Sequence, residues 1–72
     1  MGIEKLRRVM WFLREKYPNQ NNRFELRQIR RAIMEEVGLD ERTIKNSLSK
    51  LQETGMLKRI GRWWFKDEGM EY

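Results

Sequence analysis

The chain has no cysteine and no histidine among its 72 residues. Without cysteine it cannot form a disulfide or a thiolate zinc site, and without histidine it lacks the commonest remaining metal ligand and general base. The remaining catalytic candidates are carboxylates on exposed helices, in a chain too short for a deep cleft. We therefore expect no metal, no cofactor and no enzymatic activity.

Long apolar runs are missing as well. No segment approaches the roughly 18 consecutive apolar residues of a membrane span, and the first ten residues interleave their charges too closely for a signal peptide. Hydrophobic residues nevertheless make up 39% of the chain and recur in periodic blocks, which predicts a folded domain. We expect a cytoplasmic protein with neither a membrane nor a small-molecule substrate as partner.

Positive charge outweighs negative charge, most of all in one segment. Overall, 16 Lys and Arg stand against 11 Asp and Glu, and the net charge of +5 favours an anionic partner. Residues 42–66 hold seven basic residues and only Glu53 as an acid, a net charge of +6. Residues 67–72 hold three acids and no base. We expect the domain to end at residue 66 and the acidic tail to be frayed, clear of any polyanion.

The spacing of apolar residues predicts a first helix that runs to about Lys16. Its apolar stripe alternates steps of three and four residues and consists of Ile3, Leu6, Met10, Leu13 and Tyr17. Pro18 ends this helix, and Phe24, isolated in a polar stretch, supplies either a short strand or a plug for the core.

Two more helices follow, separated by only three residues. The second has an apolar face made of Leu26, Ile29, Ile33 and Val37. Gly38 closes it as a C-cap, and Asp40 starts the third helix, residues 41–54, as an N-cap. Leu39 and Ile44 are spaced for a hydrophobic staple. The short connection forces the two helices to cross steeply, as in a helix-turn-helix.

After Gly55 the pattern changes from helix to strand. Residues 56–60 and 62–66 read as two strands joined by a tight turn at Gly61. Trp63, Trp64 and Phe65 cannot all face inward in one strand, so at least one large ring must be exposed. The expected fold is α+β, with three helices followed by a two-stranded β-hairpin within residues 1–66.

The third helix presents a polar face opposite Ile44, Leu48 and Leu51. The members of this face are Arg42, Asn46, Ser49 and Glu53, and Lys45 and Lys50 flank it. Arginine can hold guanine and asparagine can hold adenine through paired hydrogen bonds, while serine and lysine suit phosphate or mixed contacts. The face is typical of a helix that reads the major groove of DNA, although the same residues could form an ordinary solvated surface.

Five arginines elsewhere extend this surface. Arg59 and Arg62 lie on either side of Gly61, where two mobile cations could contact a phosphate or enter the minor groove. Alone, they could be charges that protect a sheet edge. The second helix adds Arg27, Arg30 and Arg31, which could touch the DNA backbone or pair with Glu35 and Glu36.

The run LDERTIKNSLSKLQETGMLKRIGRWWF, residues 39–65, resembles winged helix-turn-helix regulators of transcription from recognition helix through wing. Its most specific pieces are Arg42-Thr43-Ile44, Leu48 with Leu51, Glu53 before Gly55, and Met56-Leu57-Lys58-Arg59 leading to Gly61-Arg62. By this resemblance the third helix would lie in the major groove of double-stranded DNA, with Thr43 among its contacts, and the hairpin would be the wing. Met34 departs from the pattern, since a small residue often stands four before the turn glycine.

The resemblance leaves two classes of partner open. The compact, arginine-rich, cysteine-free chain looks like small regulators of archaea and their viruses, which implies sequence-specific binding to DNA. Winged helices also serve as protein-interaction modules in larger assemblies, and an acidic partner protein could satisfy the charge of residues 42–66. A titration against random duplex separates the two.

Trp11 lies roughly 120° from the centre of the apolar stripe of the first helix, where it would be exposed. An exposed tryptophan in a small protein suggests a partner. We expect a homodimer built on the first helix, with Trp11, Met10 and Tyr17 at its interface. Alternatively, Met70 and Tyr72 of the tail fold back over the Trp11 ring.

Overall fold

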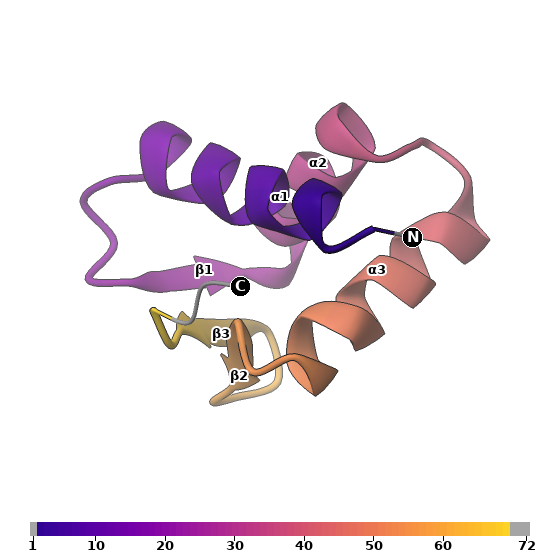
Figure 1. The fold of residues 1–72 in the computed structure, drawn as a ribbon. Helices are drawn as coiled ribbons and strands as arrows, with labels where there is room; N and C mark the ends of the chain where they lie inside the picture. Colours follow the sequence, from indigo (N-terminus) through magenta and orange to yellow (C-terminus); the bar gives the residue numbers. More distant parts are fainter. Residues whose placement is uncertain (1, 70–72) are drawn as a thin grey trace.

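The computed structural model describes residues 2–69 and has an α+β fold (Figure 1). The elements in chain order are α1 (Ile3–Lys16), β1 (Arg23–Glu25), α2 (Leu26–Glu36), α3 (Glu41–Glu53), β2 (Leu57–Arg59) and β3 (Trp64–Asp67). The three expected helices are confirmed, with bounds within one residue of those expected at most ends. None of the helices in this described part is long and apolar enough to cross a membrane.

The sheet has three antiparallel strands in the order β1-β3-β2, and not the two that we expected. The additional strand comes from the segment around Phe24, which pairs directly with Phe65, and both rings are buried. Backbone hydrogen bonds extend this pairing at either end, from Asp67 N to Asn22 O (2.7 Å) and from Leu26 N to Trp63 O (2.8 Å). Of the two roles open to Phe24, the structure shows the strand.

The connection between β2 and β3 consists of residues 60–63, so the expected tight turn at Gly61 is wrong. Within it, Ile60 N donates to Trp64 O at 3.0 Å. Gly61 does not adopt the left-handed conformation that two-residue hairpin turns require; among the described glycines, only Gly55 and Gly69 have positive φ. Instead, the Arg59 guanidinium stabilises the loop by donating to Gly61 O (3.1 Å) and Arg62 O (2.7 Å).

The core lies between the three helices and the inner face of the sheet, and it follows the expected stripes with local differences. Its buried apolar members are Leu6, Val9, Met10, Leu13, Phe24, Ile29, Ala32, Ile33, Ile44, Leu51, Met56, Leu57 and Phe65. Ile3 is exposed because it begins the helix, and Tyr17 is only half-buried because it follows the last turn. Ser47 takes a fully buried position on α3, whereas Leu48 is half-buried.

The turn between α2 and α3 differs from expectation at two residues. Leu39 is 79% exposed, so the staple with Ile44 does not form. The C-cap of α2 is Val37 and not Gly38, which does not adopt a left-handed conformation. A Cβ atom at Gly38 would lie 3.6 Å from Thr43 Cγ2. The helices are joined by a salt bridge from Arg30 to Glu41 (2.8 Å) instead. The N-cap at Asp40 is confirmed, since its side chain accepts from Thr43 N at 3.3 Å.

Asp67 is the last residue of β3 and is buried, so the expectation that the frayed tail begins there is wrong. Arg14 Nε and Nη2 donate to its two carboxylate oxygens at 2.6 and 3.0 Å, and Gly69 N donates at 2.8 Å. Burial raises the pKa of Asp67, but the hydrogen bonds from Arg14 and Gly69 and the Arg14 charge outweigh it, and the pKa is lowered. The proposed cover of Trp11 by Met70 and Tyr72 lies outside the described residues.

Candidate nucleic-acid interface

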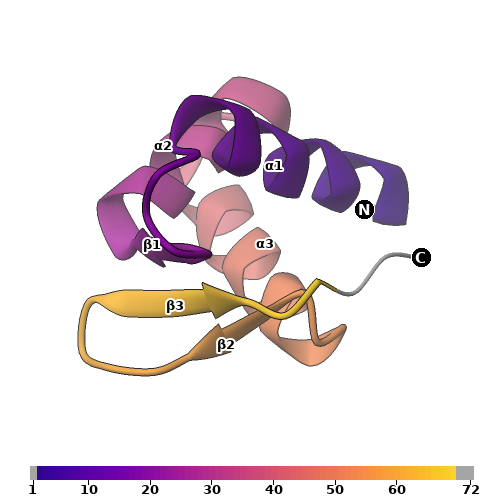
Figure 2. The same ribbon diagram turned by 90° about the vertical axis from the view of Figure 1, so that its left-hand side faces the viewer.

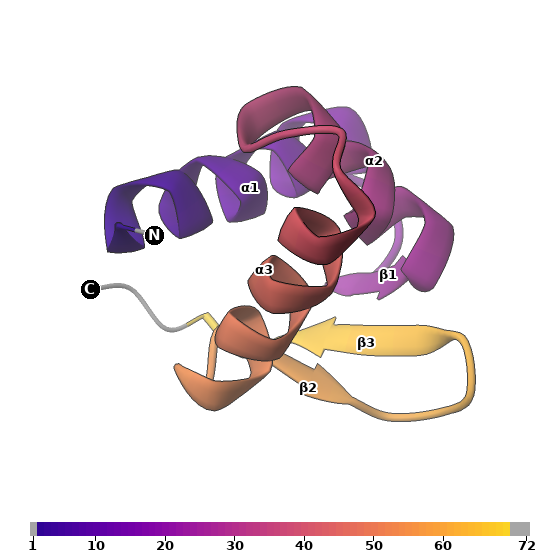
Figure 3. The same ribbon diagram turned by 90° about the vertical axis from the view of Figure 1, so that its right-hand side faces the viewer.

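The outer face of α3 consists of polar side chains directed to solvent. Figure 3 shows α3 in front of the other helices, with the loop between β2 and β3 to one side of it. Arg42, Asn46 and Ser49 are exposed, and their side chains make no hydrogen bond or ion pair with the part of the chain that the structure describes. Thr43 is half-buried beside the turn. The helical spacing therefore predicted the face correctly, and its hydrogen-bonding groups are available to a ligand.

The acidic residues at the two ends of α3 are already paired. Arg30 holds Glu41 at the N-terminus. The hydrogen bond from that guanidinium lowers the pKa of Glu41; burial opposes it, and the charges of Arg30 and Lys45 add to the lowering. At the C-terminus, Lys50 lies 3.3 Å from Glu53. The unopposed positive charge of the helix thus lies in its first two turns, and Lys50 is a weaker candidate than Lys45.

The hairpin tip carries two arginines whose positions are more fixed than the sequence suggested. The Arg59 guanidinium is held by the loop carbonyls and lies 5.3 Å from the centre of the Phe65 ring. Arg62 lies 5.4 Å from the centre of the Trp63 ring. Stacking of this kind leaves the N–H edge of a guanidinium free to donate. Of the two, Arg62 is the better candidate for a direct phosphate contact.

Both tryptophans of the hairpin are exposed, Trp63 by 56% and Trp64 by 39%, and only Phe65 enters the core. The sequence required at least one exposed ring. It could not tell that both would be exposed, because this depends on where the strand begins: Trp63 belongs to the loop and Trp64 to the outer face of β3.

The arginines of α2 have partners other than the ones that local spacing suggested. Arg27 pairs with Glu25 at 2.8 Å, and Arg30 with Glu41, whereas within residues 2–69 these arginines form no ion pair with Glu35 or Glu36. Arg31 is exposed and forms no ion pair within residues 2–69. Arg27, Arg30 and Trp63 line one shallow hollow, which places the start of α2 beside the hairpin loop.

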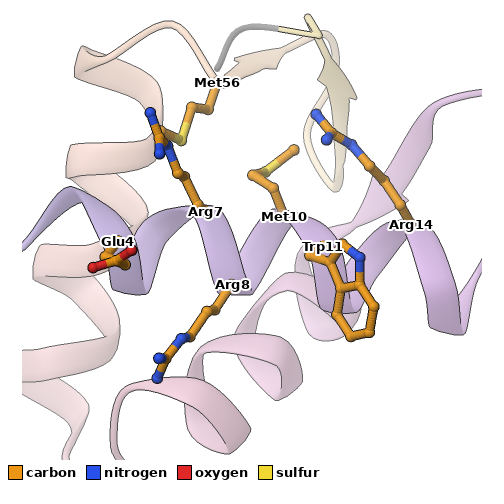
Figure 4. Close-up of a pocket in the computed structure, with 7 residues that line it drawn as sticks. All are labelled: Glu4, Arg7, Arg8, Met10, Trp11, Arg14 and Met56. Atoms are coloured by element: carbon orange, nitrogen blue, oxygen red, sulfur yellow. The ribbon is translucent and has the colours of Figure 1, made fainter. Parts of the chain in front are cut away.

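The three residues expected at a dimer interface do not form one patch. Trp11 is 63% exposed, but Met10 is only 2% exposed and belongs to the core. Tyr17 is half-buried and lies beside Arg27 and Arg31 of α2. Figure 4 shows the surroundings of Trp11, a hollow along α1 lined by Glu4, Arg7, Arg8, Met10, Arg14 and Met56. Trp11 is therefore the member of the set that offers surface to a partner.

Two further observations bear on the chemistry of the surface. Within residues 2–69, no group of three or more acidic side chains is placed to hold a metal ion. The outer face of the sheet carries exposed basic residues on all three strands, which the sequence analysis missed because β1 was not recognised as part of the sheet. Comparisons with protein-family models, with curated proteins and with solved structures found no match to the chain.

Proposed function

We propose that the protein is a winged helix-turn-helix regulator of transcription that binds double-stranded DNA in a sequence-specific manner and is not an enzyme. In this proposal α3 lies in the major groove, α2 crosses behind it, and the β2–β3 hairpin is the wing that contacts the backbone or the adjoining minor groove. The observation that carries the proposal is the outer face of α3, where Arg42 and Asn46 are exposed and unpaired among the described residues.

The chemistry of this face fits base edges better than it fits an acidic protein surface. Asparagine and serine carry no charge, so they add nothing to attraction for an acidic partner, but they can form directed hydrogen bonds with bases or phosphates. The cations that would contact phosphates flank them, with Lys45 on the same helix and Arg27 and Arg31 on α2. In such an arrangement the central polar residues contact bases and specify the sequence, while the basic residues at the flanks contact phosphates and position the protein.

The direct test is a titration with random duplex DNA at several salt concentrations. If Lys45, Arg27, Arg31 and Arg62 each contact one phosphate, the slope of log affinity against log salt should be about −3.6. A selected site should then bind more tightly than random duplex at the same salt. A chain that binds no duplex at about 50 mM salt contradicts the proposal and favours the protein-interaction module. A chain that binds all duplexes equally contradicts sequence-specific binding.

For the wing, we predict that Arg62→Ala weakens binding to all duplexes alike, because a phosphate contact carries no sequence information. The slope of log affinity against log salt should become shallower by about 0.9 for one lost contact. Arg62 is a cleaner target than Arg59, whose guanidinium also holds the hairpin loop. Lys16→Ala, at the exposed end of α1, is the matched control. If the two variants have equal slopes, the hairpin does not contact the backbone.

We also propose that the protein binds its site as a homodimer through the Trp11 face of α1. A protomer of 28 × 24 × 21 Å is smaller than the roughly 34 Å of one helical turn, so two copies fit side by side on one face of the duplex. The site should then be a near-palindrome. In a two-fold symmetric dimer the same surface patch serves both subunits, so Trp11 of each protomer would lie in the interface.

Trp11→Glu should therefore separate the subunits while the monomer stays folded, because the ring is mostly outside the core. The variant should lose cooperative binding to a full site and keep weak binding to a half-site. Lys16→Glu introduces an acidic residue on the same helix and should leave the dimer intact. Sedimentation equilibrium decides the question: a wild-type protein that stays monomeric at high micromolar concentration, with and without DNA, has no such dimer.

A further inference from the structure

The outer face of the sheet carries three basic side chains in one row across the strands. Arg23 of β1 is the direct partner of Lys66 of β3, and Lys66 is the direct partner of Lys58 of β2. All three are exposed, while the alternate positions Phe24, Phe65 and Leu57 point into the core. Because neighbouring strands lie about 4.8 Å apart, the row spans about 10 Å between its outer members.

This row has no counterion within residues 2–69. None of its three side chains forms an ion pair or hydrogen bond there. Glu25, on β1 two residues after Arg23, is occupied by Arg27. Glu68 lies beside Lys58 and Arg59 at the other edge without pairing to either. Like charges directly opposite each other destabilise a sheet, so the row weakens the fold unless an anion is bound to it.

An aromatic ring lies next to the row on the same face. Trp64 is two residues before Lys66 on β3, and in a strand this spacing places both side chains on one side of the sheet. Trp64 is 39% exposed, and Ile60 beside it is 44% exposed. Together with Arg23 and Gln20 they line a shallow hollow. The face thus combines a flat apolar platform with a line of cations.

This surface is separate from the proposed reading face of α3. Figure 2 shows the β2–β3 hairpin in front and α3 behind it, whereas Figure 3, from the opposite side, has α3 in front. A ligand lying on the outer face of the sheet therefore does not occupy the exposed face of α3.

We propose that the outer face of the sheet binds single-stranded nucleic acid, with phosphates along the Arg23–Lys66–Lys58 row and a base stacked on Trp64. A single strand leaves its bases free to stack on an aromatic ring while its backbone follows a basic surface. In a duplex the base faces are already stacked, and this face offers no helix that could enter a groove. The proposal does not depend on duplex binding by α3.

The test measures the affinity of the full chain for fluorescently labelled dT12 and U12 oligonucleotides. Trp64→Leu should weaken binding about 5- to 150-fold, the range for loss of one stacked base. Trp63→Leu is the matched control: it removes the neighbouring exposed ring, which belongs to the loop, and should leave binding unchanged. The DNA and RNA arms show which single strand the face prefers.

The row is tested with Lys66→Gln, which should have two opposite effects. It removes a repulsion between strands, so the Tm should rise by a few degrees, while oligonucleotide binding weakens and its salt slope becomes shallower by about 0.7. A residue with a purely structural role would not combine higher stability with weaker binding. Arg42→Ala should leave oligonucleotide binding unchanged.

Four results would overturn the proposal. The wild type could bind neither oligonucleotide, or Trp64→Leu and Lys66→Gln could bind as tightly as the wild type. Alternatively, Arg42→Ala could weaken single-strand and duplex binding equally, which would mean one shared surface. Self-association that Trp64→Leu abolishes would assign the face to a second copy of the chain and would also overturn it. Duplex affinity, measured on the same variants, reports on α3 separately.

Discussion

Replacing Asp67 with alanine should lower the free energy of unfolding by about 2 to 3 kcal/mol. The substitution removes the carboxylate that accepts two hydrogen bonds from Arg14 and one from Gly69 N. Breaking a fully buried ion pair costs about 3 to 5 kcal/mol, but the Arg14 side chain is one-third exposed and can be rehydrated in part. Since a domain of 72 residues is stable by only about 4 to 10 kcal/mol, urea unfolding should detect the loss easily.

Glu68→Ala is the matched control for this experiment. It removes the next acidic side chain along the chain, which is exposed and pairs with nothing in residues 2–69. Its effect should stay within about 0.5 kcal/mol. If the two variants lose the same stability, Asp67 does not hold the end of β3 to α1, and the domain ends before it.

The ion pair between Arg14 and Asp67 makes the free energy of unfolding depend on pH. The pKa of Asp67 is lower in the folded chain than its ordinary value of 3.8, so its stabilisation is complete above that value and is lost as the pH falls through the folded-state pKa. The difference in unfolding free energy between wild type and Asp67→Ala should therefore be constant near neutrality and shrink at pH values below about 3.8. Urea midpoints measured across this range check the prediction.

Asp67 also shows why the sequence misjudged the end of the domain. Three acids in the last six residues look like a solvated tail, and the residue that pairs with the first of them is Arg14, 53 positions earlier. A pattern confined to neighbouring residues has no access to a contact across that distance. The three helices were predictable because their apolar spacing is local, and β1 was only partly predictable because three residues give too short an alternation.

Local spacing likewise predicts only part of the candidate site, and the rest depends on contacts between residues distant in sequence. The outer face of α3 follows from 3.6 residues per turn once Ile44 and Leu51 are placed inward, and the structure places them there. The partners of the arginines did not follow, because Arg30 reaches across the turn to Glu41 and Arg59 turns back onto its own loop. The row on the outer sheet face depends on strand register, which no single strand reveals.

Substitutions on the outer face of α3 should have a large effect on DNA binding. Arg42→Ala and Asn46→Ala should each weaken binding to a selected DNA site by roughly 1 to 3 kcal/mol, or about 5- to 150-fold, and should relax the preference at one base position. Both side chains are exposed and make no hydrogen bond within residues 2–69, so the free energy of unfolding should change by no more than about 0.5 kcal/mol. Binding selections on randomised duplexes, with melting curves of the same variants, measure both quantities.

Lys45→Ala on the same helix separates base reading from charge. If Lys45 contacts a phosphate, its loss should weaken all duplexes alike, make the salt slope shallower by about 0.9 and leave the selected sequence unchanged. Asn46→Ala should leave the salt slope at the wild-type value, because an uncharged side chain releases no counterion. It should instead relax the preference at one base position. The two residues are adjacent and both exposed, which makes them a matched pair. If Arg42→Ala and Asn46→Ala retain the selected motif and its affinity, α3 does not read the bases, and the groove contact must come from another element.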